Sequence, residues 1–134
     1  MASRLNPYLN FNRDARQAME FYASVFGGEL NITTFAQFDP SSQDSDLVMH
    51  AALDTDAGYT IMAADTPSGM EYLPMTGAAV SLSGDDAAAL HSYWEQLSAD
   101  GTTTMPLEKQ AWGDEFGMCT DKFGVPWLVN ISPA

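Results

Sequence analysis

Residues 8–28 read YLNFNRDARQAMEFYASVFGG, and this stretch decides the fold. Leu9 and Phe11 alternate with polar residues, which is the two-residue period of a half-buried strand. Asp14 is a favourable N-cap residue. It precedes apolar residues at helical spacing: Ala15, Ala18, Met19, Tyr22 and Phe26. Gly27-Gly28 follows the last of these, as glycine commonly does where a helix ends. The stretch therefore predicts a strand over residues 8–12 and then a helix.

Three apolar and β-branched runs follow this helix and are predicted to be strands. They cover residues 30–38, 47–53 and 59–64. Polar loop residues separate the runs. Residues 65–76 contain two prolines and are predicted to connect this half of the chain to the next.

The same pattern recurs in the second half of the chain. A strand is predicted over residues 79–83, a helix from Asp85 to just before Gly101, and strands over residues 102–107, 116–120 and 126–131. When the first half is shifted by 71 residues, Leu9 falls on Val80. The apolar residues of the strand and of the helix then recur at the same spacing in both halves. We therefore interpret the two halves as copies of one βαβββ module. The predicted fold class is α+β, with two mixed β-sheets that each carry a helix on one face and leave the other face to meet its counterpart or enclose a cavity.

The charge of the chain excludes two classes of partner. Five Lys and Arg residues stand against 18 Asp and Glu residues, which gives a formal net charge of -13. A surface this negative repels phosphate backbones and anionic lipid head groups. We therefore expect neither nucleic acid nor a membrane as a partner, and we interpret the acidity first as favouring solubility.

Cysteine content and hydropathy favour a cytoplasmic location. Cys119 is the one cysteine of the chain, so no intrachain disulfide can form, and this fits a reducing compartment. We expect Cys119 to be a buried structural thiol. Residues 1–11 lack the apolar core of a signal peptide, and no apolar run approaches the roughly 18 residues that span a bilayer.

Two stretches of sequence resemble a known family. The first comprises residues 7–11, 18–22 and 25–30, which read PYLNF, AMEFY and VFGGEL. The second comprises residues 112–114, 116–117 and 121–127, which read WGD, FG and DKFGVPW. Together with Met49-His50-Ala51 they resemble the PhnB-like branch of the glyoxalase/bleomycin resistance protein/dioxygenase (vicinal oxygen chelate) superfamily over nearly the whole chain.

The resemblance implies a specific architecture. It predicts one glyoxalase/bleomycin-resistance-like domain over residues 1–134, with module one at about 5–66 and module two at about 77–132. The curved mixed sheets of the two modules are expected to form a cup. Such proteins are usually homodimers, so we also expect a homodimer. Their functions differ widely, so the fold alone does not assign one.

The metal site of the superfamily is expected to be missing. Metal-dependent members place His or Glu ligands on the first and last strands of each module. The matching positions here are Tyr8, Met62, Ala79 and Leu128. Tyr8 alone could donate to a divalent ion, which needs several convergent donors. The resemblance therefore implies no metal and no cofactor.

His50 is the best candidate for a catalytic residue, because a histidine can give or take a proton near neutral pH. The sequence identifies no partner for it, and a single histidine in a strand is more often a packing residue than a ligand. His91, the other histidine, is expected to face solvent from the second helix. Whether the chain is an enzyme stays open.

The residues expected to face the cup define a predicted ligand site. They are Tyr8, Asn10, His50, Met62, Trp112, Leu128 and Asn130. This set offers apolar surface, neutral hydrogen-bonding groups and no Lys or Arg. We therefore expect a metal-independent small-molecule-binding protein that takes an apolar or aromatic ligand, neutral or cationic. The alternatives are a metal-dependent lyase or dioxygenase with an unusual ligand set, a metal-free isomerase that uses His50, and a dimeric scaffold without a ligand.

Overall fold

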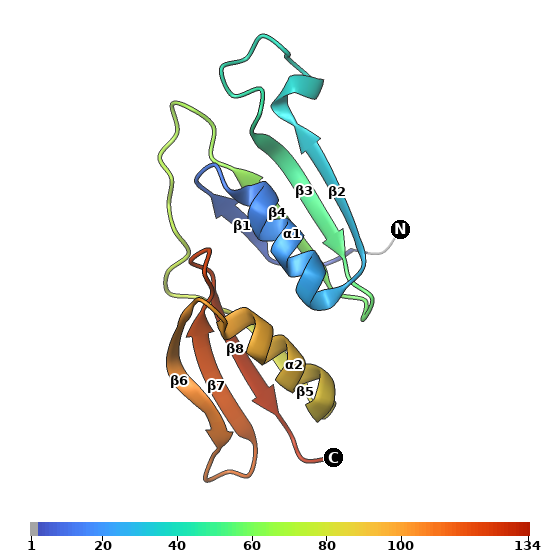
Figure 1. The fold of residues 1–134 in the computed structure, drawn as a ribbon, viewed down its shortest axis with the longest axis vertical. Helices are drawn as coiled ribbons and strands as arrows, with labels where there is room; N and C mark the ends of the chain where they lie inside the picture. Colours follow the sequence, from blue (N-terminus) through green and yellow to red (C-terminus); the bar gives the residue numbers. More distant parts are fainter. Residues whose placement is uncertain (1–2) are drawn as a thin grey trace. The chain divides into compact units, whose positions relative to one another are not determined.

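The computed structural model describes residues 3–134 and contains two compact units, one ending at Pro74 and the other comprising Met75–Ala134. Each unit has the element order βαβββ (Figure 1). The predicted duplication and the α+β class are confirmed. The prediction that both modules form one domain over residues 1–134 stays a prediction.

The first unit is a four-stranded mixed sheet with one helix. Its elements are β1 (Tyr8–Phe11), α1 (Ala15–Phe26), β2 (Glu29–Thr34), the short 3-10 helix η1 (Phe35–Gln37), β3 (Val48–Asp54) and β4 (Thr60–Asp65). The strand order is β1-β4-β3-β2. β1 runs parallel to β4, and the other neighbours are antiparallel.

The second unit repeats this arrangement. Its elements are β5 (Val80–Gly84), α2 (Ala87–Ser98), β6 (Thr102–Lys109), β7 (Glu115–Thr120) and β8 (Pro126–Ile131). The strand order is β5-β8-β7-β6, again with the first strand parallel to the last. The order of the first sheet is therefore reproduced strand for strand.

One predicted strand ends earlier than expected. The sequence predicts a strand over residues 30–38, but β2 ends at Thr34 and Phe35–Gln37 forms η1. The ladder between β2 and β3 is irregular between Thr33 and Thr34. The N–H of Phe38 donates to the carbonyl oxygen of Phe35 at 3.0 Å, so this backbone bonds locally and no longer extends the sheet.

Helix α1 covers one face of the first sheet (Figure 1). Leu9 and Phe11 of β1 and Ile61 and Ala63 of β4 are buried on this face. The helix buries its own apolar side against them: Ala15, Ala18, Met19, Tyr22, Val25 and Phe26. Because side chains alternate along a strand, the intervening residues of β1 and β4 lie on the opposite, open face.

The turn after α1 requires glycine at position 28. Gly28 has a φ of 107°, in the region that favours glycine. A Cβ atom there would lie 2.1 Å from the carbonyl oxygen of Asp54. The Gly27-Gly28 pair thus ends the helix and also lets β2 begin directly beside the end of β3.

Asp65 joins three elements of the first unit. It is buried at the end of β4, and its two carboxylate oxygens accept hydrogen bonds from different backbone groups. Oδ1 accepts from the N–H of Ala15, the first residue of α1, and Oδ2 accepts from the N–H of Val48, the first residue of β3, each at 2.9 Å. A carboxylate at a helix N-terminus is also favoured by the helix dipole.

Asp121 has a comparable role in the second unit. Its Oδ1 accepts from the N–H groups of Phe123 and Val125, and its Oδ2 accepts from the indole N–H of Trp127 at 2.8 Å. Trp127 is buried on the side of the sheet opposite Leu128, as its place in the strand predicts. Cys119 is also buried, as expected, and burial followed by the charge of Asp121 raises the pKa of its thiol to about 11.

Asp44 and Ser68 connect two loops of the first unit. The carboxylate of Asp44 accepts hydrogen bonds from both the hydroxyl and the backbone N–H of Ser68. These bonds, the hydroxyl bond foremost, lower the pKa of Asp44. The contact holds the segment after β4 against the loop that precedes β3.

The buried position of Asp65 predicts a large loss of stability on Asp65→Asn. The amide would turn one acceptor oxygen into a donor that faces a backbone N–H. We expect a cost of about 1.5–3 kcal/mol in the free energy of unfolding, measured as a lower midpoint of urea denaturation with an unchanged slope. Asp46→Asn, at an exposed position, is the matched control and should shift stability by less than about 0.5 kcal/mol. Equal effects of both substitutions would contradict the assigned role of Asp65.

The lowered pKa of Asp44 predicts a pH dependence. A carboxyl whose folded pKa lies below its unfolded value stabilises the fold above the unfolded pKa, and this contribution disappears as pH falls through the folded pKa. We therefore expect the backbone N–H of Ser68 to lose protection from hydrogen exchange as the pH drops below about 4. In Asp44→Asn the protection should already be weak at pH 7 and change little with pH. Full protection of Ser68 in that variant at pH 7 would refute the role of the contact.

Candidate functional site

The open face of the first sheet brings together four of the predicted site residues. Tyr8 pairs in register with Met62, and Met62 with Ala52. Asn10 follows Tyr8 on the same face of β1, and His50 precedes Ala52 on the same face of β3. Tyr8, Asn10, His50 and Met62 therefore share the face opposite α1.

Tyr8 and His50 form a hydrogen-bonded pair on this face. The hydroxyl oxygen of Tyr8 lies 3.1 Å from Nδ1 of His50, and the ring centroids are 5.7 Å apart. The bond joins β1 to β3 across the intervening strand β4. Burial raises the pKa of the Tyr8 hydroxyl, so Tyr8 is neutral at neutral pH. His50 thus has the partner that the sequence did not identify.

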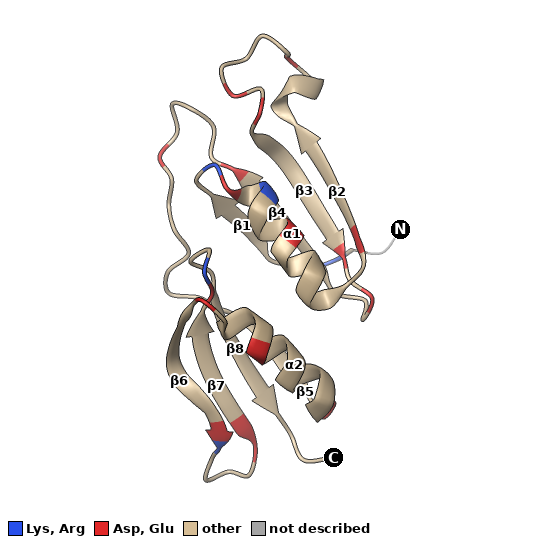
Figure 2. Cartoon of the chain, viewed as in Figure 1, with Lys and Arg blue, Asp and Glu red and all other residues tan. Residues whose placement is uncertain are grey.

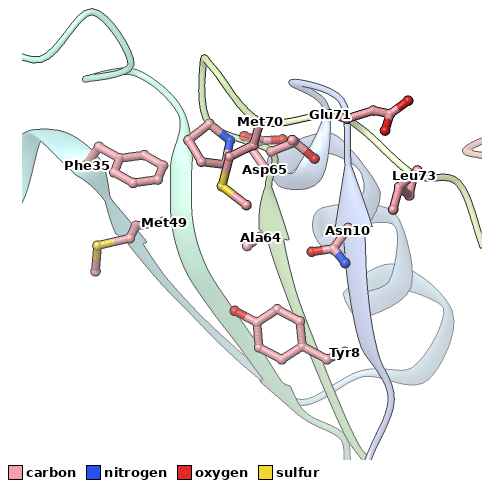
Figure 3. A pocket seen from close by; sticks show the side chains of 11 residues that line it. Tyr8, Asn10, Phe35, Met49, Ala64, Asp65, Met70, Glu71 and Leu73 are labelled. Carbon is pink, nitrogen blue, oxygen red and sulfur yellow. The ribbon is translucent and has the colours of Figure 1, made fainter.

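A pocket of about 400 Å³ adjoins this pair within the first unit (Figure 3). Its lining residues come from β1, β3, β4, η1 and the segment after β4: Tyr8, Asn10, Phe35, Met49, Ala64, Asp65, Thr66, Pro67, Met70, Glu71 and Leu73. Tyr8 and Asn10 belong to the predicted site, whereas His50 and Met62 do not line the pocket. Figure 3 shows the ring of Tyr8 lying across β4 with its hydroxyl toward β3.

Residues 66–73 are the part of this site that sequence reasoning missed. The segment is predicted only as a connection between the two halves, yet it supplies five of the lining residues. Pro67, Met70 and Leu73 are apolar residues in a stretch without regular structure. Their recurrence in an otherwise polar connection is the signal that could have indicated a binding segment.

The charges around the pocket are acidic. Asp65 and Glu71 line it, and its lining residues include no Lys or Arg. Acidic residues outnumber basic ones on both units (Figure 2), in keeping with the net charge of -13. Both oxygens of Asp65 accept backbone hydrogen bonds, while Glu71 is exposed to solvent.

The other three predicted site residues lie in the second unit. Trp112 is 64% exposed in the turn between β6 and β7, and its ring meets the ring of Phe116 edge-on at 6.2 Å. Leu128 pairs in register with Ser81 of β5, two residues after Ala79, which precedes the strand. Asn130 donates a hydrogen bond to Asp114 at 2.9 Å. That these three residues contact the same ligand as Tyr8 stays a prediction.

His91 has a carboxylate partner that the sequence did not identify. Its Nε2 lies 3.3 Å from the carboxylate of Glu115 at the start of β7, and its side chain is 44% exposed. His91 is thus partly exposed to solvent, as expected, and it also contacts Glu115. From α2, its side chain reaches the first residue of β7.

The donors that could bind a metal are sparse in residues 3–134. No group of three or more His, Cys, Asp or Glu side chains is arranged to hold an ion there. On the open face of the first sheet, the Tyr8–His50 pair offers one phenol oxygen and one imidazole, which is short of the three or four protein donors of ordinary sites. Within the same range, the structure has no helix with the length and apolar character needed to cross a membrane.

Similar sequences and structures cover nearly the whole chain. The family model for 3-demethylubiquinone-9 3-methyltransferase matches residues 3–130. Protein YjdN of Escherichia coli K12 is 31% identical over 141 residues, which cover 95% of this chain and 94% of YjdN. The crystal structure of protein PA1353 from Pseudomonas aeruginosa is 32% identical, with a TM-score of 0.89 and coverage of 99% of this chain and 100% of that one.

More distant structures share the fold. A putative 3-demethylubiquinone-9 3-methyltransferase, the PhnB protein from Bacillus cereus, is 22% identical with a TM-score of 0.76, covering 97% of this chain and 100% of that one. A glyoxylase/bleomycin resistance protein/dioxygenase domain from Frankia is 12% identical with a TM-score of 0.68, covering 98% and 93%. The βαβββ units described above, together with the match over residues 3–130, show that the chain belongs to the PhnB-like 3-demethylubiquinone-9 3-methyltransferase family, which has the glyoxalase/bleomycin resistance fold.

Proposed function

We propose that this chain is a metal-independent small-molecule-binding protein. Its ligand is an apolar or aromatic molecule, neutral or cationic, which binds in the pocket of the first unit. The pocket on the open face of the first sheet is the observation that carries the proposal. Its volume of about 400 Å³ lies within the range of about 300–1,000 Å³ that is usual for ligand sites.

The chemistry of the lining supports an apolar ligand. Phe35, Met49, Met70 and Leu73 supply apolar surface, and two of these are methionines, whose flexible side chains adapt to ligands of different shape. Tyr8 and Asn10 add neutral polar groups from β1. A mostly apolar pocket with a few oriented polar groups is the usual form of a small-molecule site.

The charge of the lining disfavours an anionic ligand. An anion in this pocket would lose its hydration without gaining a Lys or Arg partner from the lining residues. The net charge of -13 repels anions at long range and attracts cations. Neutral and cationic ligands are therefore the classes that the site favours.

The alternative function is a metal-dependent lyase or dioxygenase with an unusual ligand set. The Tyr8–His50 pair supplies two donors, and a catalytic metal site of this kind uses at least three protein ligands. The donor set therefore favours binding without a metal. The pocket supports ligand binding, and it supplies no argument for the methyl transfer that the family's name describes.

Two further parts of the proposal concern the setting of the protein. We infer a homodimer from the family resemblance, together with the exposed edge strand β6, whose backbone can pair with another chain. We infer a cytoplasmic location from the single, buried thiol of Cys119.

The donor set predicts the metal content of the purified protein. Protein prepared without chelator should contain no stoichiometric divalent metal in elemental analysis. Added zinc, nickel, manganese or iron should leave its melting temperature unchanged, because a specifically bound ion would raise it by mass action. About one ion per chain, lost on His50→Ala, would refute binding without a metal and favour the alternative function.

The pocket predicts which ligands bind and which substitution prevents binding. Among three bicyclic probes, 1-naphthylmethylamine (a cation) and 2-tetralone (neutral) should bind more tightly than 2-naphthoate (an anion). Ala64→Leu fills the floor of the pocket, and we expect it to weaken binding about tenfold or more, which corresponds to about 1.4 kcal/mol. Titration calorimetry or ligand-observed NMR measures these affinities.

Ala52→Leu is the matched control for this experiment. Ala52 lies on the same open face of the sheet, on β3, outside the pocket lining. The added side-chain volume is identical, so affinity should stay close to that of the unmodified protein. Tightest binding of the naphthoate, or equal effects of the two substitutions, would disprove the assignment of the pocket.

A further inference from the structure

The Tyr8–His50 pair lies where it can act on a molecule in the pocket. Tyr8 is a lining residue, and its hydroxyl is 3.1 Å from Nδ1 of His50. His50 does not line the pocket, so within this pair Tyr8 is the residue that a bound molecule can reach. The two residues are 42 positions apart in sequence and come from different strands. A ligand group beside Tyr8 would therefore contact a hydroxyl that is already bonded to a base.

This arrangement changes what a tyrosine can do. A neutral phenol by itself is a weak base, and the partial burial of Tyr8, which is 49% exposed, raises the pKa of its hydroxyl above the ordinary value. An imidazole bonded to the same oxygen can accept the phenol proton while the oxygen takes another proton from a ligand. The imidazole of histidine is suited to this step because it gains and loses protons near neutral pH.

We propose that Tyr8 and His50 form a proton relay that removes a proton from the carbon next to the carbonyl group of a neutral, apolar or aromatic ketone. This inference rests on the proposed function, because the ketone must first bind in the pocket. Tyr8 is the catalytic residue of the relay, since it contacts the substrate. His50 acts through Tyr8 and is a positioning residue that also stores the proton.

The step balances without any further reactant. The C–H bond next to the carbonyl group breaks, and its electron pair forms the carbon–carbon double bond of an enolate. The proton joins the oxygen of Tyr8 while the hydroxyl proton of Tyr8 moves to Nδ1 of His50. Reversal of both transfers returns a proton to the same carbon or to a conjugated one, which gives back the ketone or an isomer.

The surroundings select a neutral substrate for this reaction. No Lys or Arg lines the pocket, so a substrate that is already anionic would lack a compensating charge. The relay itself creates an imidazolium at His50 as the enolate forms. The new positive charge at His50 is separated from the enolate by the hydroxyl of Tyr8, so the two opposite charges lie on either side of that hydroxyl and attract one another.

The test follows hydrogen–deuterium exchange of 2-tetralone in D2O by proton NMR, using the whole chain. The unmodified protein should increase the rate of loss of the signals from the carbons beside the carbonyl group over the rate in buffer. Tyr8→Phe and His50→Gln should each reduce this increase about tenfold or more. Glutamine can still hydrogen-bond to Tyr8 but is not a base, so His50→Gln separates proton acceptance from mere structural support.

Two additional variants make the result specific. Added imidazole should restore exchange in His50→Ala, which a purely structural role of His50 would not permit. His91→Gln is the matched control, because it replaces the other histidine, which bonds to Glu115 outside the pocket, and it should leave exchange unchanged. Exchange at the buffer rate with the unmodified protein, or an unchanged increase in Tyr8→Phe or His50→Gln, would overturn the relay.

The same probe distinguishes failure of the relay from failure of the proposed function. If 2-tetralone binds and the binding depends on Ala64, but exchange equals that in buffer, the relay is wrong and the binding function stands. If none of the bicyclic probes binds, the proposed function fails and the relay fails with it.

Discussion

The first unit depends on the two hydrogen-bond acceptors of Asp65. One oxygen holds the first turn of α1 and the other holds the first residue of β3, so a single buried carboxylate fixes a helix and a strand relative to β4. A buried carboxylate is tolerated only when such donors surround it. Because Asp65 also lines the pocket, the same residue that aligns the core defines one wall of the binding site.

The first sheet has one face covered by α1 and one open face, and the candidate site lies on the open face. Helix α1 buries Leu9, Phe11 and Ala63 on one side, and this apolar contact accounts for the alternation in β1 and β4. The residues between them, including Tyr8 and Asn10, then lie on the open face without any requirement to be apolar. Polar or reactive side chains can therefore be placed on the open face without disturbing the core.

The candidate site combines parts that differ in rigidity. Tyr8 and His50 lie on β1 and β3 of one sheet, on either side of β4, and the register of these three strands fixes their separation. Residues 66–73 supply five of the residues that line the pocket and have no regular structure. The hydrogen bonds of Asp44 to Ser68 hold that segment in place. Positioned polar groups on strands, together with an adaptable apolar segment, suit a protein that binds apolar molecules of differing shape.

The sequence by itself determined the elements and the faces. Alternation in residues 8–12 placed Leu9 and Phe11 in the core, and helical spacing placed Ala18 and Tyr22 against them, because these periods depend only on local backbone geometry. The tertiary structure alone decided that His50 meets Tyr8 and that Met70 and Leu73 line the pocket. Those contacts depend on the order of the strands in the sheet and on the path of residues 66–73. Neither of these produces a periodic pattern of residues in the sequence.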